Sequence, residues 1–298
     1  MPPRPGGPAP GQQPPAQPQL PPAAALANKR YAPPGATPAG PEPEIGHALK
    51  PYSTVITRER RDKCLGAAEI DPRLFGDLVE PALIANEAFR AIKGTGFSID
   101  GYLHAESRFV MTEALPVDNV LALKGRIAAK TATSRGPRVV YAFDLLKGNG
   151  GALGSLTVDV VISGGQAPPR DPGAAAGAPA ADATAGYRQV GSKQVTPNRV
   201  DNYSRYVGNQ IHFDPLFASR HGYKEPLAQG LMQLSWMMAA LAAGAKPPAA
   251  FDLTIRFPRP LFWSEAATIW RAGGGTALRC LNPARKVTAD AVFADYRT

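Results

Sequence analysis

Residues 211–230 of this chain read IHFDPLFASRHGYKEPLAQG and are the most informative stretch of the sequence. They place His212 in a loop and then deliver Gly230 to the start of an apolar helix, predicted at Leu231 to Leu241. The first N–H groups of a helix have no intrahelical partner and attract negative charge. A histidine that faces them can transfer a proton beside a developing oxyanion, which suits reactions at the carbon next to a thioester carbonyl.

The composition is that of a globular chain without a membrane span. The 298 residues are 44% hydrophobic, which allows one large domain or two small ones. A membrane helix needs about 18 consecutive apolar residues, and the longest candidate, Leu231 to Ala243, is too short and contains Gln233 and Ser235. The two cysteines, Cys64 and Cys280, show no metal-ligand spacing and predict a cytoplasmic protein without disulfides.

An excess of basic residues has two interpretations. Lys and Arg total 33 against 24 Asp and Glu, which gives a formal charge of +9. The excess is either a solvated surface or an attraction to an anionic partner, such as a phosphorylated cofactor or an acidic carrier protein. Nucleic acid is not expected as a partner, because the one dense basic run, residues 58–63, is broken by acids and contains no aromatic residue.

Two low-complexity segments divide the chain. Residues 1–44 are dominated by Pro, Ala, Gly and Gln and are predicted to be a disordered tail, because they cannot bury enough apolar surface to offset chain entropy. Residues 164–186, rich in Gly, Pro and Ala, are predicted to be a flexible linker. The two remaining blocks, 45–163 and 187–298, each have the common size of a domain.

The two blocks repeat one order of elements, a helix followed by an antiparallel meander. In both, an apolar strand ends near a Pro-containing corner, after Phe109 in the first block and after Phe257 in the second. A sheet that wraps around a helix, present twice, is an α+β layout. The predicted helices are Glu80 to Ile92 and Leu231 to Leu241, and the predicted strands are 107–112, 120–128, 138–146 and 155–162, then 252–257, 266–271, 276–281 and 286–296.

The motif in residues 211–230 and the two helix-then-strands units resemble the MaoC-like hydratases of the hot-dog fold. The match is best over residues 188–298, while residues 50–163 resemble the degenerate first domain of double-hot-dog enzymes. The resemblance implies a tandem (double) hot-dog fold, in which each antiparallel sheet wraps around a central helix. It also implies a pseudo-dimer within one chain, with a further homodimer left open.

The same resemblance implies a substrate and an activity. The implied activity is that of an (R)-specific enoyl-CoA hydratase or 3-hydroxyacyl thioester dehydratase of fatty acid metabolism. The substrate would be carried as a CoA thioester or on the phosphopantetheine arm of an acyl carrier protein. No metal and no redox cofactor are implied.

One residue of the family's motif, Gly-Asp-x-Asn-Pro-(Ile/Leu)-His, is missing. In the family the Asp and the His hold a water molecule. His212 falls on the histidine, and Gly230 falls on the glycine whose N–H polarises the thioester carbonyl. Without a gap the aspartate falls on Val207, and with a loop two residues shorter it falls on Asn209. Gln229 is a second departure, because family members often have His at that position.

Four residues are therefore candidates for the catalytic site. His212 is the expected acid–base residue and Gly230 the expected oxyanion donor; the structural alternatives are a histidine bonded to the backbone and a glycine needed for close packing. Asn209 could hold the water as a neutral donor and acceptor, or could form a turn. Asp214 could orient His212 in place of the missing acid, although a cap or turn role is favoured.

Arg256 and Arg259 would contact the phosphates of CoA or phosphopantetheine, or else lie on a solvated sheet edge. His104 and His221 match no motif and are not expected to act. Four large residues of the second helix are expected in the core, although some of them could also line an acyl tunnel: Met232, Trp236, Met237 and Met238.

Three functions are consistent with these residues. The first is a hydro-lyase that adds water to 2-enoyl thioesters or removes it from (R)-3-hydroxyacyl thioesters. The second is a degenerate hot-dog protein that binds acyl thioesters or acts as a scaffold, which the missing aspartate favours. The third is a thioesterase, which would need a carboxylate near the helix start, where Glu225 is the only candidate.

Overall fold

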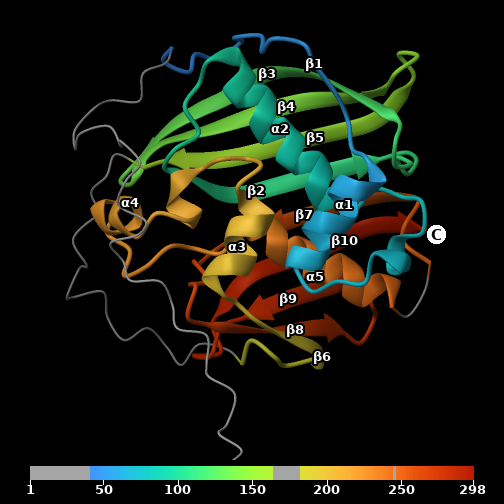
Figure 1. The fold of residues 1–298 in the computed structure, drawn as a ribbon, viewed down its shortest axis with the longest axis vertical. Coiled ribbons are helices and arrows are strands. Elements are labelled where there is room, and N and C mark those ends of the chain that lie inside the picture. The colour runs from blue at the N-terminus through green and yellow to red at the C-terminus, as the bar shows by residue number, and fades with distance from the viewer. Residues whose placement is uncertain (1–40, 164–181, 244–245) are drawn as a thin grey trace, which may run out of the picture. The chain divides into compact units, whose positions relative to one another are not determined.

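One antiparallel sheet of ten strands carries the fold (Figure 1). In this computed structural model, which describes residues 41–163, 182–243 and 246–298, the strand order is β1-β3-β4-β5-β2-β7-β10-β9-β8-β6. The second five strands repeat the first five in mirrored order. Their bounds are β1 Tyr52–Val55, β2 Tyr102–Met111, β3 Val120–Thr133, β4 Gly136–Lys147, β5 Ala152–Ile162, β6 Tyr187–Gln194, β7 Ala250–Arg256, β8 Ala266–Ala272, β9 Ala277–Leu281 and β10 Val287–Arg297.

The two halves meet at the pairing of β2 with β7. The antiparallel register runs from Glu106 opposite Arg256 to Met111 opposite Phe251. The hydrogen bonds of this pair make the two half-sheets continuous, and the described residues all belong to one compact unit. The pseudo-dimer within one chain is therefore built on a shared sheet.

Two central helices, α2 and α5, lie against the same face of the sheet (Figure 1). They contact each other as well as the strands. In α2, Pro81 occupies the first turn, where its missing N–H costs nothing, and Gly96 ends the helix in a left-handed conformation. The helical segments are α1 Arg58–Ala67, η2 Pro72–Phe75, α2 Pro81–Thr95, α3 Pro197–Ser204, η3 Gln210–His212, α4 Pro215–Arg220 and α5 Gly230–Ala242.

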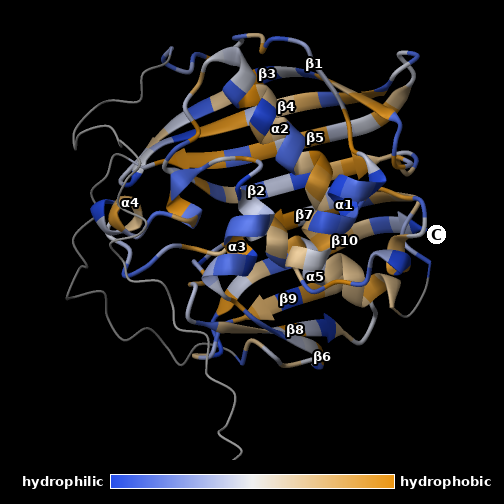
Figure 2. Cartoon of the chain, viewed as in Figure 1, coloured by the Kyte–Doolittle hydropathy of each residue, from blue (hydrophilic) through white to orange (hydrophobic). Residues whose placement is uncertain are grey.

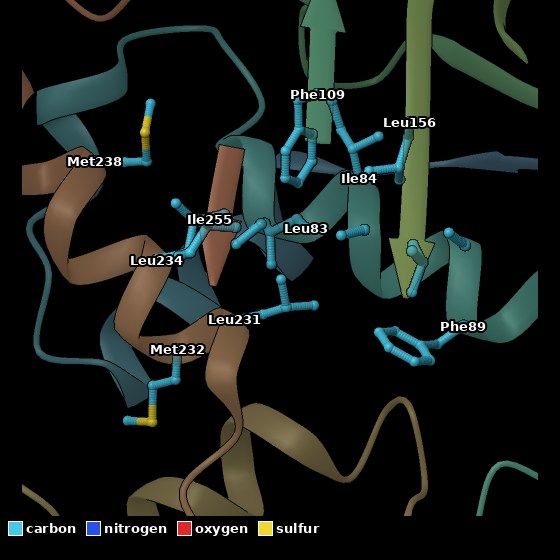
Figure 3. Close-up of a cluster of buried hydrophobic side chains, with 14 of the residues drawn as sticks. Leu83, Ile84, Phe89, Phe109, Leu156, Leu231, Met232, Leu234, Met238 and Ile255 are labelled. Carbon is cyan, nitrogen blue, oxygen red and sulfur yellow. The ribbon is translucent and has the colours of Figure 1, made fainter. Parts of the chain in front are cut away.

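The hydrophobic core lies between these two helices and the sheet. Figure 3 shows Leu83 of α2, Leu231 of α5 and Ile255 of β7 within one cluster of buried side chains. Figure 2 shows α1 and α3, in contrast, as largely hydrophilic helices. The residues predicted in the core of the second helix are each at most 2% exposed, which confirms that prediction: Met232, Trp236, Met237 and Met238.

The structure confirms the α+β double hot-dog layout that the sequence predicted. Both central helices and all eight predicted strands are present, although several strands are longer than expected. Strands β1 and β6 and helices α1, α3 and α4 were not predicted. Most of the predicted tail, 1–44, and linker, 164–186, lies outside the described residues. None of the described helices is long and apolar enough to cross a membrane.

Candidate active site

A cleft with a volume of about 110 Å³ opens at the start of α5. Both halves of the chain line it, because β2 and the β3–β4 turn of the first half lie beside the loops of the second half. Its polar and charged lining residues are Tyr102, His104, Arg135, Asn209, His212, Tyr223, Gln229, Gln233 and Arg259. No carboxylate belongs to the described lining, so the cleft favours an anionic or neutral ligand.

His212 is held in this cleft by its own backbone and by one ring nitrogen. It is the last residue of η3, and Nδ1 lies 3.0 Å from the carbonyl oxygen of Leu227. The carbonyl of His212 accepts a hydrogen bond of 2.8 Å from the indole of Trp263. These bonds fix the position of the imidazole relative to the segment that precedes α5.

The charge state of His212 follows from its burial. Burial lowers the pKa of His212 to about 4, because the cation loses its hydration, and the bond to Leu227 offsets this only in part. The ring is therefore neutral at pH 7. With Nδ1–H donating to Leu227, the Nε2 atom carries the lone pair and has no hydrogen-bond partner among the described residues. A neutral imidazole with one free nitrogen can act as a base.

Gly230 is the first residue of α5 and lines the same cleft. The preceding residue, Gln229, makes no side-chain cap, and the N–H of Gly230 has no acceptor in the described part of the chain. A Cβ atom at Gly230 would come within 2.8 Å of the Phe257 ring. Only glycine allows this close packing, and its N–H at the helix start is left without an acceptor in a residue that lines the cleft.

The first half of the chain has no such donor at the corresponding place. The N–H of Val79 bonds to Leu115 just before α2, as that of Ala228 bonds to Leu261 just before α5. This correspondence places Pro81 where the second half has Gly230, and proline has no N–H. The small cavity beside Pro81 is lined only by apolar residues in the described part.

Asn209 and Asp214 are engaged in holding loops together. Asn209 is buried; Nδ2 donates to the carbonyl of Tyr102 (3.0 Å), and Oδ1 accepts from the N–H groups of Gly101 (3.2 Å) and Ile211 (3.3 Å). Asp214 caps α4 by accepting from the N–H groups of the next turn. Among the described residues neither side chain bonds to His212, so the roles of water holder and of orienting acid have no geometric support. At the other position considered for the aspartate, Val207 lines the cleft and supplies only an apolar surface.

His104, which matches no sequence motif, lines the cleft together with His212. A β-bulge between His104 and Glu106 of β2 changes the alternation of side chains along the strand. His104 Nε2 lies 2.7 Å from Ser107 Oγ. Burial and the proximity of His212 lower the pKa of His104 to about 3. No sequence signal shows this approach, because it depends on the bulge and on the pairing of the two halves.

The two arginines that were predicted to contact phosphate lie in different places in the structure. Arg259 lines the cleft, whereas Arg256 lies on the exposed sheet surface in an ion pair of 2.8 Å with Glu106. Arg135, in the turn between β3 and β4, lines the cleft although the sequence did not point to it. Arg135 and Arg259, one from each half of the chain, therefore both line the cleft.

Two further features bear on the alternatives. Glu225, the carboxylate considered for a thioesterase, accepts a hydrogen bond from Ser264 and is not part of the described cleft lining. In the part of the chain that the structure describes, no three His, Cys, Asp or Glu side chains form a group that could hold a metal ion. Cys64 and Cys280 are free and buried.

Comparison with known proteins is informative for the fold alone. No family model and no curated protein matches the sequence. HtdX of Mycobacterium tuberculosis is 17% identical, with a TM-score of 0.64 over 82% of this chain and 99% of that chain. A MaoC-like dehydratase is 13% identical, with a TM-score of 0.64 over 85% and 98%. A second M. tuberculosis protein, reported to have a double hot-dog fold, is 13% identical, with a TM-score of 0.57 over 82% and 94%. These similarities concern the fold, and the chain therefore has the double hot-dog fold.

Proposed function

We propose that this chain is a hydro-lyase of the MaoC-like class, which interconverts 2-enoyl thioesters and (R)-3-hydroxyacyl thioesters. The observation that carries the proposal is one cleft that holds both a neutral imidazole with a free Nε2, on His212, and an unpaired N–H at the start of α5, on Gly230. The double hot-dog fold of MaoC-like dehydratases supports the same class of reaction by analogy.

The dehydration can be written with these two groups. Nε2 of His212 takes the proton from C2 of the substrate, and the charge moves to the thioester oxygen, which the Gly230 N–H stabilises. The enolate then expels the hydroxyl group from C3, and the imidazolium returns its proton to that group, which leaves as water. Hydration is the reverse, with His212 taking a proton from water and delivering one to C2. One base serves both steps, in keeping with a cleft whose described lining holds no carboxylate.

The carrier of the acyl group is part of the proposal. Arg135 and Arg259 line the cleft and have no carboxylate partner among the described residues, which favours a phosphate group there. CoA and phosphopantetheine both present phosphates at the far end of the thioester arm. The two free, buried cysteines are consistent with the reducing cytoplasm, which we include as the proposed location.

A non-catalytic thioester-binding protein is the alternative, and the lack of a carboxylate in the described lining is the observation in its favour. The experiment that separates the two functions follows the enoyl absorbance of crotonyl-CoA with purified protein. If the protein is a hydro-lyase, the enoyl absorbance of crotonyl-CoA decreases with time. The substitution His212→Ala then lowers the rate of that decrease by about 10²–10⁴-fold, the usual contribution of a positioned acid–base group. Binding of crotonyl-CoA without turnover by the unmodified protein would instead support the alternative.

A further inference from the structure

A buried set of hydrogen bonds connects the two central helices and ends at the cleft wall. Ser235 Oγ donates to Glu80 Oε2 (2.7 Å), and the hydroxyl of Tyr203 lies 2.8 Å from Ser235 Oγ. Asn86 lies beside the hydroxyl of Tyr203. Gln229 Nε2 then donates to Asn86 Oδ1 (2.8 Å). All five side chains are at most 4% exposed.

Different groups hold the two ends of this set. Glu80 Oε1 accepts from the N–H of Ala82 (3.0 Å), and the hydroxyl of Tyr203 also donates to the carbonyl of Leu231 (3.1 Å). At the other end, Gln229 donates its NH₂ group to Asn86 Oδ1 and is left with a free carbonyl oxygen.

That oxygen, Oε1 of Gln229, is buried and has no hydrogen-bond partner in the described part of the chain. An unsatisfied buried acceptor costs about 1–3 kcal/mol, and such groups in native proteins call for an explanation. Gln229 lines the cleft and directly precedes Gly230. The residue pair Gln229–Gly230 at the cleft wall therefore holds a buried, unpaired acceptor beside the unpaired N–H of Gly230.

We propose that Gln229 Oε1 accepts a hydrogen bond from the 3-hydroxyl group of the substrate, or from the water that adds to C3. This inference rests on the proposed function. When the Gly230 N–H holds the thioester oxygen, the bound acyl group lies next to Gln229, the residue before Gly230. The hydroxyl-bearing carbon C3 is only two carbons from the carbonyl carbon. Because the last torsion of Gln229 has a broad minimum, a small rotation would turn Oε1 toward the cleft. Gln229 is a positioning residue, because an amide does not take up the proton.

Gln233 provides a matched control. It lies one helical turn after Gln229 on α5, lines the same cleft and is equally buried. Its carbonyl oxygen already accepts a hydrogen bond of 2.6 Å from Thr288. The two glutamines thus differ in whether the carbonyl oxygen is free, and only Gln229 is expected to recognise a hydroxyl donor.

The experiment compares two thioesters that differ by that hydroxyl. Dissociation constants for (R)-3-hydroxybutyryl-CoA and butyryl-CoA are measured by calorimetry with the full chain carrying His212→Ala, which stops turnover. We expect the hydroxylated ligand to bind roughly 3- to 10-fold more tightly, the value of one hydrogen bond. Adding Gln229→Met removes this preference, and adding Gln233→Met retains it. A thermal melt verifies folding, and Gln229→Ala replaces Gln229→Met if the latter does not fold.

The outcomes separate the proposed role of Gln229 from the proposed function of the protein. The role of Gln229 is refuted, while the proposed function stands, if the His212→Ala protein binds both thioesters equally tightly. The same holds if the preference for the hydroxylated thioester survives the added Gln229→Met substitution. If neither thioester binds to the unmodified protein, the proposed function fails as well.

Discussion

Glu80 gives a prediction about stability that does not depend on the proposed reaction. Its side chain is fully buried at the start of α2, and burial raises the pKa of Glu80 from 4.5 to about 7, although the bonds from Ala82 and Ser235 lower it in part. The folded protein therefore keeps a proton that the unfolded chain loses as pH rises from 4.5 to 7. Stability is highest below pH 4.5 as far as this group is concerned, falls through that window, and stays reduced above pH 7.

The size of the effect follows from the shift. A difference of 2.5 units between 4.5 and about 7 corresponds to roughly 3 kcal/mol, at 1.36 kcal/mol per unit. Glu80→Gln imitates the protonated side chain and does not titrate. The free energy of unfolding of the variant, relative to the unmodified protein, should thus rise by about 3 kcal/mol between pH 4.5 and pH 8.

Urea denaturation of both proteins at the two pH values measures this change, and the comparison cancels the titration of all other groups. Glu87→Gln is the control, because Glu87 is also buried but bonds to Arg60 and Tyr52, so that its replacement removes an ion pair. The control is expected to be destabilised, because it loses the ion pair with Arg60. A constant difference in unfolding free energy between Glu80→Gln and the unmodified protein at the two pH values would refute the reasoning.

Three further predictions concern the cleft. Because burial lowers the pKa of His212 to about 4, kcat/KM for crotonyl-CoA should be flat from pH 8 to pH 5 and fall only below; a decline centred near 6.5 would mean an ordinary histidine. Gly230→Ala places a Cβ atom within 2.8 Å of Phe257 and should shift the helix start, lowering kcat by about 10²-fold in steady-state assays; an unchanged kcat would argue against the Gly230 N–H as oxyanion donor. Arg135→Ala should raise KM for crotonyl-CoA but not for a phosphate-free N-acetylcysteamine thioester, while Arg256→Ala, outside the cleft, should change neither; equal effects on both substrates would exclude a phosphate contact.

The sequence predicts best those features that depend on local spacing. The apolar periodicity of the two central helices and the pattern of eight strands predicted the α+β layout, since both are properties of contiguous segments, and the resemblance to MaoC-like proteins supplied the double hot-dog fold. Helix α1 was missed because its ten residues, RERRDKCLGA, have almost no apolar periodicity. Strands β1 and β6 were missed for a related reason: they lie at the sheet edges and are only partly buried, so their side chains do not alternate clearly in hydropathy.

The residues of the candidate site also differ in whether local sequence could predict them. His212 and Gly230 could be paired from the sequence because a single motif of 20 residues contains both. His104 and Arg135 could not, because they reach the cleft from the other half of the chain through a bulge and a hairpin turn. The free oxygen of Gln229 depends on the hydrogen bond of its NH₂ group to Asn86, which is 143 positions away. Features that need two distant segments to meet leave no trace in local spacing.

The proline at the start of α2 has a consequence for stoichiometry. A symmetric pair of identical hot-dog subunits would present two equivalent helix starts, and each could take up a thioester. Here Pro81 removes the donor from one of them, and apolar residues surround it. If the proposed function holds, a tight-binding thioester analogue should therefore saturate at one equivalent per polypeptide, bound at the start of α5 rather than at the start of α2.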